Sequence, residues 1–181
     1  MLRIHRVADR SAADALNDRS LVGEQAFLQV TGSGFSLRYL PTERADWQRF
    51  AGQTPAADRP SICLLAEQDG APVGFACVQV RSGWGELLDL RVDVAHRRQG
   101  IASLLLESCM HFVREQQLYG LCTETTDRNP TYCRLLQHLG FTLGGIDPMF
   151  LYPDPNERHK PLRQRACLLR FYWIDKTKAD G

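Results

Sequence analysis

The hydrophobic period of the chain changes near Gln99, and this change constrains the fold more than any other feature. Before it, Glu86–Val92 reads as a largely apolar strand. After it, apolar residues recur at helical spacing, and Leu121–Thr125 then reads as a strand again. The residues on the predicted helix face are Ile101, Leu104, Leu105, Ser108, Cys109, Phe112 and Val113. A strand, a helix and a strand in this order favour an α/β fold.

The remaining segments are expected to extend this unit on both sides. Strands are expected at Leu2–Val7, Ile62–Glu67, Val73–Val80, Phe141–Leu143 and Ala166–Ile174. Helices are expected at Ser11–Phe27 with an interruption near Ser20–Gly23, from Pro41 through Trp47 and Phe50, and from Asn129 to Gly140. The predicted fold is a single α/β domain over residues 1–181, with a mixed and largely antiparallel central sheet flanked by helices.

The composition argues against several classes of partner. Lysine and arginine number 22 against 21 acidic residues, so charge gives no reason to expect a nucleic acid. No apolar stretch reaches membrane-spanning length, and the N-terminal segment lacks the apolar core of a signal peptide. The six cysteines form no CxxC pair and no zinc-type cluster. They are expected to be reduced core thiols, without a metal, in a cytoplasmic protein.

The loop Arg97–Ala102 joins the predicted strand to the amphipathic helix. The first amides of a helix have no internal partners, and the helix dipole is positive there. Gly100 lets the backbone approach a ligand closely, and Arg97 and Arg98 add positive charge. These features predict a pyrophosphate site. The alternative from the residues alone is a polar loop, since neither GxxxxGK[ST] nor GxGxxG occurs.

Two motifs resemble those of the GNAT acetyltransferases. Arg97-Arg98-Gln99-Gly100-Ile101-Ala102 is similar to the [Q/R]xxGx[G/A] signature, and Asn129 through Phe141 resembles the later NxxAxxLYxxxGF segment. Both occur in the family's order and at its usual separation, within approximately residues 61–152. The resemblance implies a GNAT-like domain that uses acetyl-CoA as co-substrate, needs no metal and acetylates a primary amine of a small molecule.

A narrower resemblance is to the streptothricin acetyltransferases. It is carried by Glu124, Thr125, Asn129, Cys133, Gly140, Phe141, Gly144, Gly145, Asp147, Tyr152 and the terminal Phe171-Tyr172-Trp173. This pattern implies a streptothricin-like antibiotic as the acetyl acceptor. Shared ancestry can keep such a pattern while the acceptor changes. A protein or peptide amine, or a non-catalytic acyl-CoA-binding module, therefore remains an alternative.

The family resemblance also assigns the cofactor site. In GNAT folds two strands splay apart around the pantetheine arm, and here these are Glu86–Val92 and Leu121–Thr125. The resemblance implies that main-chain groups of Leu90, Val92 and Val94 bind the arm and the acetyl carbonyl, and that a main-chain N–H near Arg91 or Val92 polarises this carbonyl. The implied phosphate-binding residues are Arg97, Arg98, Gln99, Gly100, Ile101 and Ala102. Asn129 either helps to place the arm or is simply the N-cap of its helix.

Acetyl transfer needs a neutral amine, and an amine with a pKa of about 10.4 is almost fully protonated at neutral pH. A carboxylate acting directly or through water can accept the proton. The candidates are Glu86, Asp89 and Glu124, of which Glu86 is the preferred base and Glu124 the preferred contact for a cationic acceptor. For each, the alternative is a solvent-facing side chain or an ion-pair partner.

The thiolate that leaves needs a proton, and many family members supply it from a tyrosine in the LYxxxGF segment. Leu136 occupies that position here. Tyr132 lies one helical turn earlier, so it either reaches the sulfur or packs on the sheet. Cys133 and His138 lie nearby without matching the motif.

The expected partner is a small-molecule amine. The basic segment within Pro153–Arg165 is unfavourable beside a polycation if it borders the site, and is otherwise a solvated loop. A homodimer through the apolar final strand, Ala166–Ile174, would cover an edge that is otherwise exposed. The sequence leaves the oligomeric state open.

Overall fold

The computed structural model describes residues 1–32, 34–48, 52–147 and 166–175, and these fall into two compact units. Unit 1 comprises Met1–Ser20, Arg49–Cys122 and Ile174–Gly181. Unit 2 comprises Leu21–Gln48 and Thr123–Trp173. One domain for the whole chain stays a prediction.

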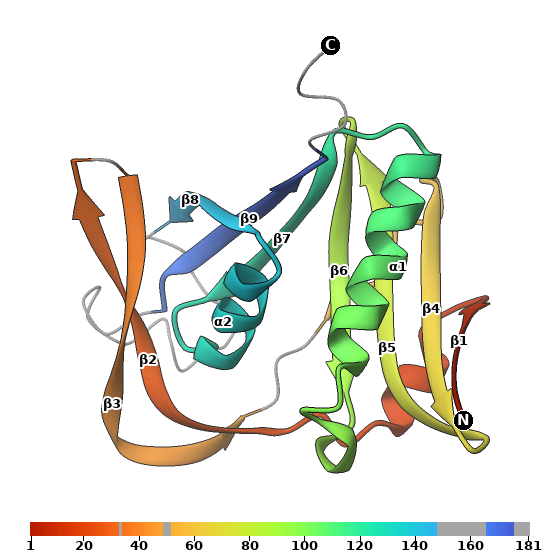
Figure 1. Ribbon diagram of the computed structural model, residues 1–181, viewed down its shortest axis with the longest axis horizontal. Helices are drawn as coiled ribbons and strands as arrows, with labels where there is room; N and C mark the ends of the chain where they lie inside the picture. Colours follow the sequence, from red (N-terminus) through yellow and green to blue (C-terminus); the bar gives the residue numbers. More distant parts are fainter. Residues whose placement is uncertain (33, 49–51, 148–165, 176–181) are drawn as a thin grey trace. The chain divides into compact units, whose positions relative to one another are not determined.

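Unit 1 contains an antiparallel sheet in the order β1-β4-β5-β6 (Figure 1). Its strands are β1 (Leu2–Val7), β4 (Ser61–Gln68), β5 (Ala71–Arg81) and β6 (Trp84–Val92). Two-residue turns connect β4 to β5 and β5 to β6. Asp69 and Gly70 have φ of 53° and 83°, and Ser82 and Gly83 have φ of 50° and 82°. Such pairs of positive φ angles match the right-handed twist of a hairpin and fix the register of both strand pairs.

The two faces of this sheet are covered by different helices. Helix α1 (Ile101–Glu115) packs close to β5, where a Cβ on Gly74 would lie 2.9 Å from Ile101. The short 3-10 helix η1 (Ser11–Ala15) packs near Phe75. Because successive side chains of a strand point to opposite faces, α1 and η1 lie on opposite faces of the sheet. A second 3-10 helix, η2 (Val94–His96), follows β6.

Unit 2 contains the hairpin of β2 (Ser20–Thr31) and β3 (Gly34–Gln48), which forms its own two-stranded sheet. It also contains α2 (Pro130–His138), β8 (Thr142–Asp147) and β9 (Leu168–Ile174). Strands β8 and β9 pair in antiparallel fashion. Strand β7 (Gly120–Thr126) begins in unit 1 and ends in unit 2, where it neighbours β9.

The strand order of the larger sheet is β1-β4-β5-β6-β7-β9-β8. Strands β6 and β7, joined through α1, run in the same direction, whereas the β5–β6 and β8–β9 pairs are antiparallel (Figure 1). The predicted α/β fold with a mixed and largely antiparallel sheet flanked by helices is therefore confirmed. No helix in the described parts of the chain is long and apolar enough to cross a membrane.

The helices predicted in the first fifty residues are wrong. Among the described residues of this region only η1 is helical, while β2 occupies Ser20–Thr31 and β3 occupies Gly34–Gln48. The apolar residues of β2 fit a helical period as well as a strand period, so cross-strand pairing decides the structure. Pro41 lies within β3, which is possible because both strands of a two-stranded sheet are edges. Phe50 and the basic loop of Pro153–Arg165 lie outside the described residues.

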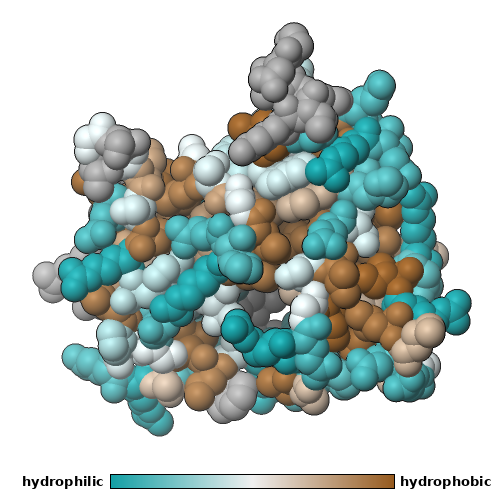
Figure 2. Space-filling view, in the orientation of Figure 1, coloured by the Kyte–Doolittle hydropathy of each residue, from teal (hydrophilic) through white to brown (hydrophobic). Residues whose placement is uncertain are grey.

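Two further expectations are corrected. Leu104 was expected on the buried face of α1 but is 41% exposed, while Leu106 and Met110 are buried. Leu104 lines a groove of about 470 Å³ between α1, β1 and β4, where Figure 2 shows hydrophobic surface beside α1 at the right of the view. The final strand β9 lies between β7 and β8, so it presents no free edge for a dimer.

Candidate functional site

The loop between β6 and α1 has the backbone form that an anion site needs. Asp93 caps η2 by accepting a hydrogen bond from the N–H of Ala95 at 2.9 Å. Gly100 then forms the N-cap of α1 with φ of 80°, and Arg98 also has a positive φ of 63°. In the described residues no side chain caps α1. The first amides of this 15-residue helix therefore lie at the positive end of its dipole without a competing acceptor side chain.

The space around Gly100 fits a phosphate group. Arg98, Gln99 and Gly100 are all exposed, and a Cβ built on Gly100 would meet no atom within 4 Å. Ile101 is buried and anchors the first turn of α1 in the core of unit 1. A diphosphate can thus approach the helix N-terminus from solvent, as the predicted cofactor-binding loop requires.

Arg97 is the first residue of this loop, and its guanidinium forms three hydrogen bonds within unit 1. It donates to the carbonyl of Asp18 at 2.7 Å, to the hydroxyl of Ser20 at 3.0 Å and to the carbonyl of Val92 at 3.2 Å. Arg97 therefore ties the end of β6 to the segment that enters β2. Of the two arginines, Arg98 carries the exposed side chain.

The main-chain N–H and C=O groups of β6 point alternately to its two edges. The N–H of Asp93 donates to the carbonyl of Val73 on β5 at 2.9 Å. Because successive main-chain groups of a strand alternate, those of Leu90 and Val92 point to the edge that faces away from β5. The N–H of Val94 is already used, since it donates to the carbonyl of Asn17 at 2.8 Å. This edge of β6 neighbours β7, and the carbonyl of Val92 there accepts a hydrogen bond from Nε of Arg97 at 3.2 Å. A role of Leu90 and Val92 in binding the pantetheine arm stays a prediction.

A β-bulge interrupts the pairing of β6 with β5. Cys77 is opposite Asp89 and Val78 is opposite Leu87, so Leu88 has no partner residue on β5. The carbonyl of Leu88 accepts a hydrogen bond from the N–H of Gln53 at 2.9 Å. Bulges of this kind often re-aim main-chain groups next to functional sites.

An ionic cluster centred on the buried Asp89 and Arg91 lies beside the bulge. Of its side chains, only that of Asp89 was among the predicted site groups. Arg91 donates through Nε to Oδ1 of Asp89 at 2.9 Å and lies 3.4 Å from Asp18 and 3.9 Å from Asp14. Arg10 reaches Oδ2 of Asp89 at 3.3 Å. Burial raises the pKa of Asp89, while the hydrogen bond from Arg91 lowers it. The sequence signal is the spacing of Asp89 and Arg91, two opposite charges on one face of an apolar strand.

The other two carboxylate candidates are partners of arginines within their own units. Glu86, on β6, lies 3.2 Å from Arg81 and has 18% of its side chain exposed. Glu124, on β7, accepts a hydrogen bond from Nε of Arg170 on β9 at 2.7 Å and is 27% exposed. Both remain reachable from solvent, but an ammonium at either one would compete with the resident arginine.

The start of α2 brings together the remaining candidates. Oδ1 of Asn129 accepts a hydrogen bond from the N–H of Tyr132 at 3.3 Å, so Asn129 is the N-cap of α2. The hydroxyl of Tyr132 lies 3.2 Å from the hydroxyl of Thr123 on β7. Leu136, at the family's tyrosine position, is fully buried, as is Cys133, whose pKa burial raises to about 12. Among these side chains, Tyr132 is the half-buried hydroxyl that faces β7.

Known proteins match the chain over most of its length. The model of the Acetyltransferase (GNAT) family matches residues 27–141. A streptothricin acetyltransferase of Escherichia coli is 31% identical over 128 residues, which cover 69% of either chain. A streptothricin acetyltransferase of Streptomyces lavendulae is 28% identical over 159 residues, which cover 80% of this chain and 82% of that protein.

Solved structures share the fold. The crystal structure of nourseothricin acetyltransferase superposes with a TM-score of 0.77 at 23% identity, over 96% of this chain and 98% of that one. A Bacillus anthracis protein solved with acetyl coenzyme A superposes with a TM-score of 0.82 at 16% identity, over 97% of this chain and 100% of that one. The family model, the curated relatives and this shared fold lead to one assignment. The chain belongs to the GNAT acetyltransferase family and is an acyltransferase that uses acetyl-CoA as its co-substrate.

Proposed function

We propose that this enzyme acetylates a primary amine of a streptothricin-like small molecule. The observation that carries the proposal is the identity to two streptothricin acetyltransferases over more than two thirds of the chain. A cationic acceptor needs carboxylates, and Glu86 on β6 in unit 1 and Glu124 on β7 in unit 2 are each partly exposed. Of these, we assign Glu86 as the base and Glu124 as a contact for a second ammonium group.

The residues of the β6–α1 region would hold the cofactor. We assign the main-chain amides from Arg98 to Ala102 to the phosphates. We assign the main-chain groups of Leu90 and the N–H of Val92 to the pantetheine arm, since the carbonyl of Val92 is engaged by Arg97. Val94 can contribute through its carbonyl, because its N–H is engaged by Asn17. Bound acetyl-CoA supplies the thioester that the amine attacks. A main-chain N–H of β6 would polarise the acetyl carbonyl, and the other residues place the cofactor.

Tyr132 is proposed as the acid for the leaving thiolate. The Tyr132→Phe variant should lower kcat by roughly 100-fold with little change in the Kd for acetyl-CoA, because only proton donation is lost. Stopped-flow kinetics and calorimetry measure the two quantities. Tyr39→Phe is the matched control, since the hydroxyl of Tyr39 on β3 donates to Oε1 of Gln137, an exposed residue of α2. Equal rates in Tyr132→Phe and the wild type would mean that solvent, and not Tyr132, protonates the leaving thiolate.

An amine panel tests the acceptor assignment. Purified enzyme and acetyl-CoA are offered streptothricin, aminoglycosides, polyamines, amino acids and peptides, and acetylated products are measured by mass spectrometry. The expected result is the highest kcat/KM for streptothricin. A higher value for a peptide would contradict this acceptor and favour a protein N-acetyltransferase.

Three broader assignments also remain proposals. We place the enzyme in the cytoplasm, where its free thiols would stay reduced. The whole chain is proposed to act as a single domain. A homodimer stays a prediction without an assigned surface, because β9 presents no free edge. Light scattering on the purified protein tests the last of these.

A further inference from the structure

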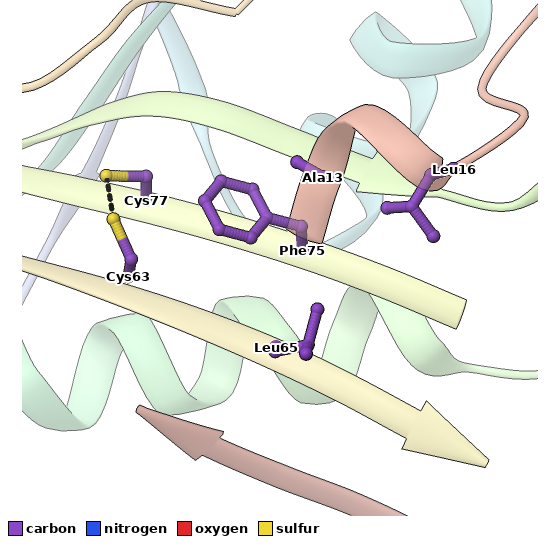
Figure 3. Packing of buried hydrophobic residues seen from close by; sticks show 6 residues of the cluster. All are labelled: Ala13, Leu16, Cys63, Leu65, Phe75 and Cys77. Carbon is purple, nitrogen blue, oxygen red and sulfur yellow. Dashed lines mark hydrogen bonds between the residues drawn. The ribbon is translucent and has the colours of Figure 1, made fainter. Parts of the chain in front are cut away.

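Cys63 and Cys77 lie directly opposite each other on β4 and β5, with their sulfur atoms 2.9 Å apart. Side chains of opposite residues in an antiparallel pair project from the same face of the sheet. Figure 3 shows the two sulfur atoms turned toward each other in the cluster that contains Phe75 and Leu65. Both cysteines are free thiols, and the acetyl-transfer proposal uses neither of them.

The backbone at this position already has the spacing of a disulfide. Opposite residues of an antiparallel pair have Cα atoms about 4.5–5.5 Å apart. Disulfides span Cα distances of about 4.4–6.8 Å. From 2.9 Å, the sulfur atoms must approach by roughly another 0.9 Å to reach the bond length of about 2.05 Å. We infer that Cys63 and Cys77 form a reversible disulfide when the protein meets a small hydroperoxide such as hydrogen peroxide.

The two thiols are not equivalent, and Cys63 is the one that reacts first. Cys63 is 6% exposed and Cys77 is 1% exposed. Cys63 is opposite Val7, the last residue of β1, so it lies where the pairing of β1 with β4 ends. The hydrogen bond with Cys77 lowers the pKa of Cys63, whereas the hydrogen bond with Cys63 and burial raise the pKa of Cys77. Because the thiolate is the nucleophile, Cys63 attacks the oxidant and Cys77 resolves the product.

The reaction balances with hydrogen peroxide alone. The Cys63 sulfur attacks one peroxide oxygen, the O–O bond breaks, and Cys63 becomes a sulfenic acid as one water leaves. The Cys77 sulfur then attacks the Cys63 sulfur, the S–O bond breaks, and the released hydroxide takes the Cys77 proton as a second water. Two thiols are oxidised and one peroxide is reduced. A thiol reductant reverses the bond by exchange.

A peptide map of the native enzyme tests this inference. The protein is treated with one equivalent of hydrogen peroxide, its free thiols are alkylated after unfolding, and its peptides are read by mass spectrometry. The expected result is a Cys63–Cys77 cross-link that dithiothreitol removes, with the other four cysteines alkylated. The melting temperature should rise by about 5 °C or more, because the bond closes a loop in the unfolded chain.

Matched variants sharpen the result. Cys63→Ala and Cys77→Ala should form no cross-link, whereas Cys109→Ala, which removes another fully buried thiol, should form it as the wild type does. Sulfinic acid at Cys63 without a cross-link, or faster oxidation of Cys122 or Cys167, would overturn the inference. The peptide map of the wild-type protein tests the Cys63–Cys77 disulfide even if a variant fails to fold. The outcome is independent of the acceptor, since no acetyl transfer is measured.

Discussion

Gly100→Glu is expected to lose acetyl-CoA binding while keeping the wild-type fold. Gly100 is the exposed N-cap of α1, and a Cβ there would meet no atom within 4 Å. The new carboxylate would stand where the unpartnered helix amides are assigned to receive the phosphates. Bringing like charges together costs several kcal/mol, so the Kd for acetyl-CoA should rise by about 100-fold or more. Isothermal titration calorimetry measures the change.

Gly70→Glu is the matched control for this substitution. Gly70 has φ of 83° against 80° for Gly100, and a Cβ on Gly70 would also meet no atom within 4 Å. Both variants therefore carry the same backbone strain of a non-glycine residue at positive φ. Gly70 lies in the β4–β5 turn, so its variant should keep the wild-type Kd. Wild-type affinity in a folded Gly100→Glu protein would exclude the phosphates from this loop.

Of the substitutions proposed for this protein, Arg91→Met is expected to lower the free energy of unfolding most. The Arg91 side chain is 4% exposed and stands between Asp89, which is 3% exposed, and Asp18, which is 7% exposed. Removing the cation leaves buried carboxylates without their main partner. Losses of this kind are about 3–5 kcal/mol in the free energy of unfolding. Urea unfolding followed by circular dichroism measures the difference.

The loss in Arg91→Met should shrink as the pH falls. Burial raises the pKa of Asp89 above its ordinary value, and Arg91 opposes that rise, so the variant raises this pKa further. A carboxyl whose pKa is raised on folding stabilises the folded state below its unfolded pKa, and this contribution disappears as the pH rises through its folded pKa. The difference in unfolding free energy between Arg91→Met and the wild type should therefore be smaller at pH 5 than at pH 8.

An exposed arginine provides the control for this effect. Arg6 pairs with Glu115 at 3.4 Å, with 68% and 44% of the two side chains exposed. Arg6→Met should lower the free energy of unfolding by less than about 1 kcal/mol. Its difference from the wild type should not shrink comparably at low pH. If Arg91→Met were no less stable than Arg6→Met, the cluster would contribute no net stability.

The helices and strands of residues 61–147 were predicted well because their local signals agree with one another. The turns at Asp69-Gly70 and Ser82-Gly83, the helical period of α1 and the Asn129-Pro130 start of α2 each specify one structure. The Ser20–Gln48 region failed because its local pattern is ambiguous. Pairing between β2 and β3, which no short window of sequence contains, decides its structure.

The backbone form of the candidate site was predictable from the sequence. A glycine before an amphipathic helix identifies the N-terminus of α1 from sequence alone. The hydrogen-bond and ion-pair partners of Arg97 and Glu124 were not predictable, because these partners are distant in the chain. Arg97 is held by Asp18 and Ser20, and Glu124 by Arg170. No local spacing indicates these partners.

Transfer of a labelled acetyl group tests the central claim most directly. Wild-type enzyme and Gly100→Glu are each incubated with streptothricin and acetyl-CoA that carries an isotope in the acetyl group. Mass spectrometry follows the antibiotic, and a thiol reagent follows the release of CoA. We expect one labelled acetyl group on an amine for each CoA released by the wild type, and neither acetylated amine nor released CoA with Gly100→Glu. CoA release without acetylated amine, or equal product from both proteins, would contradict it.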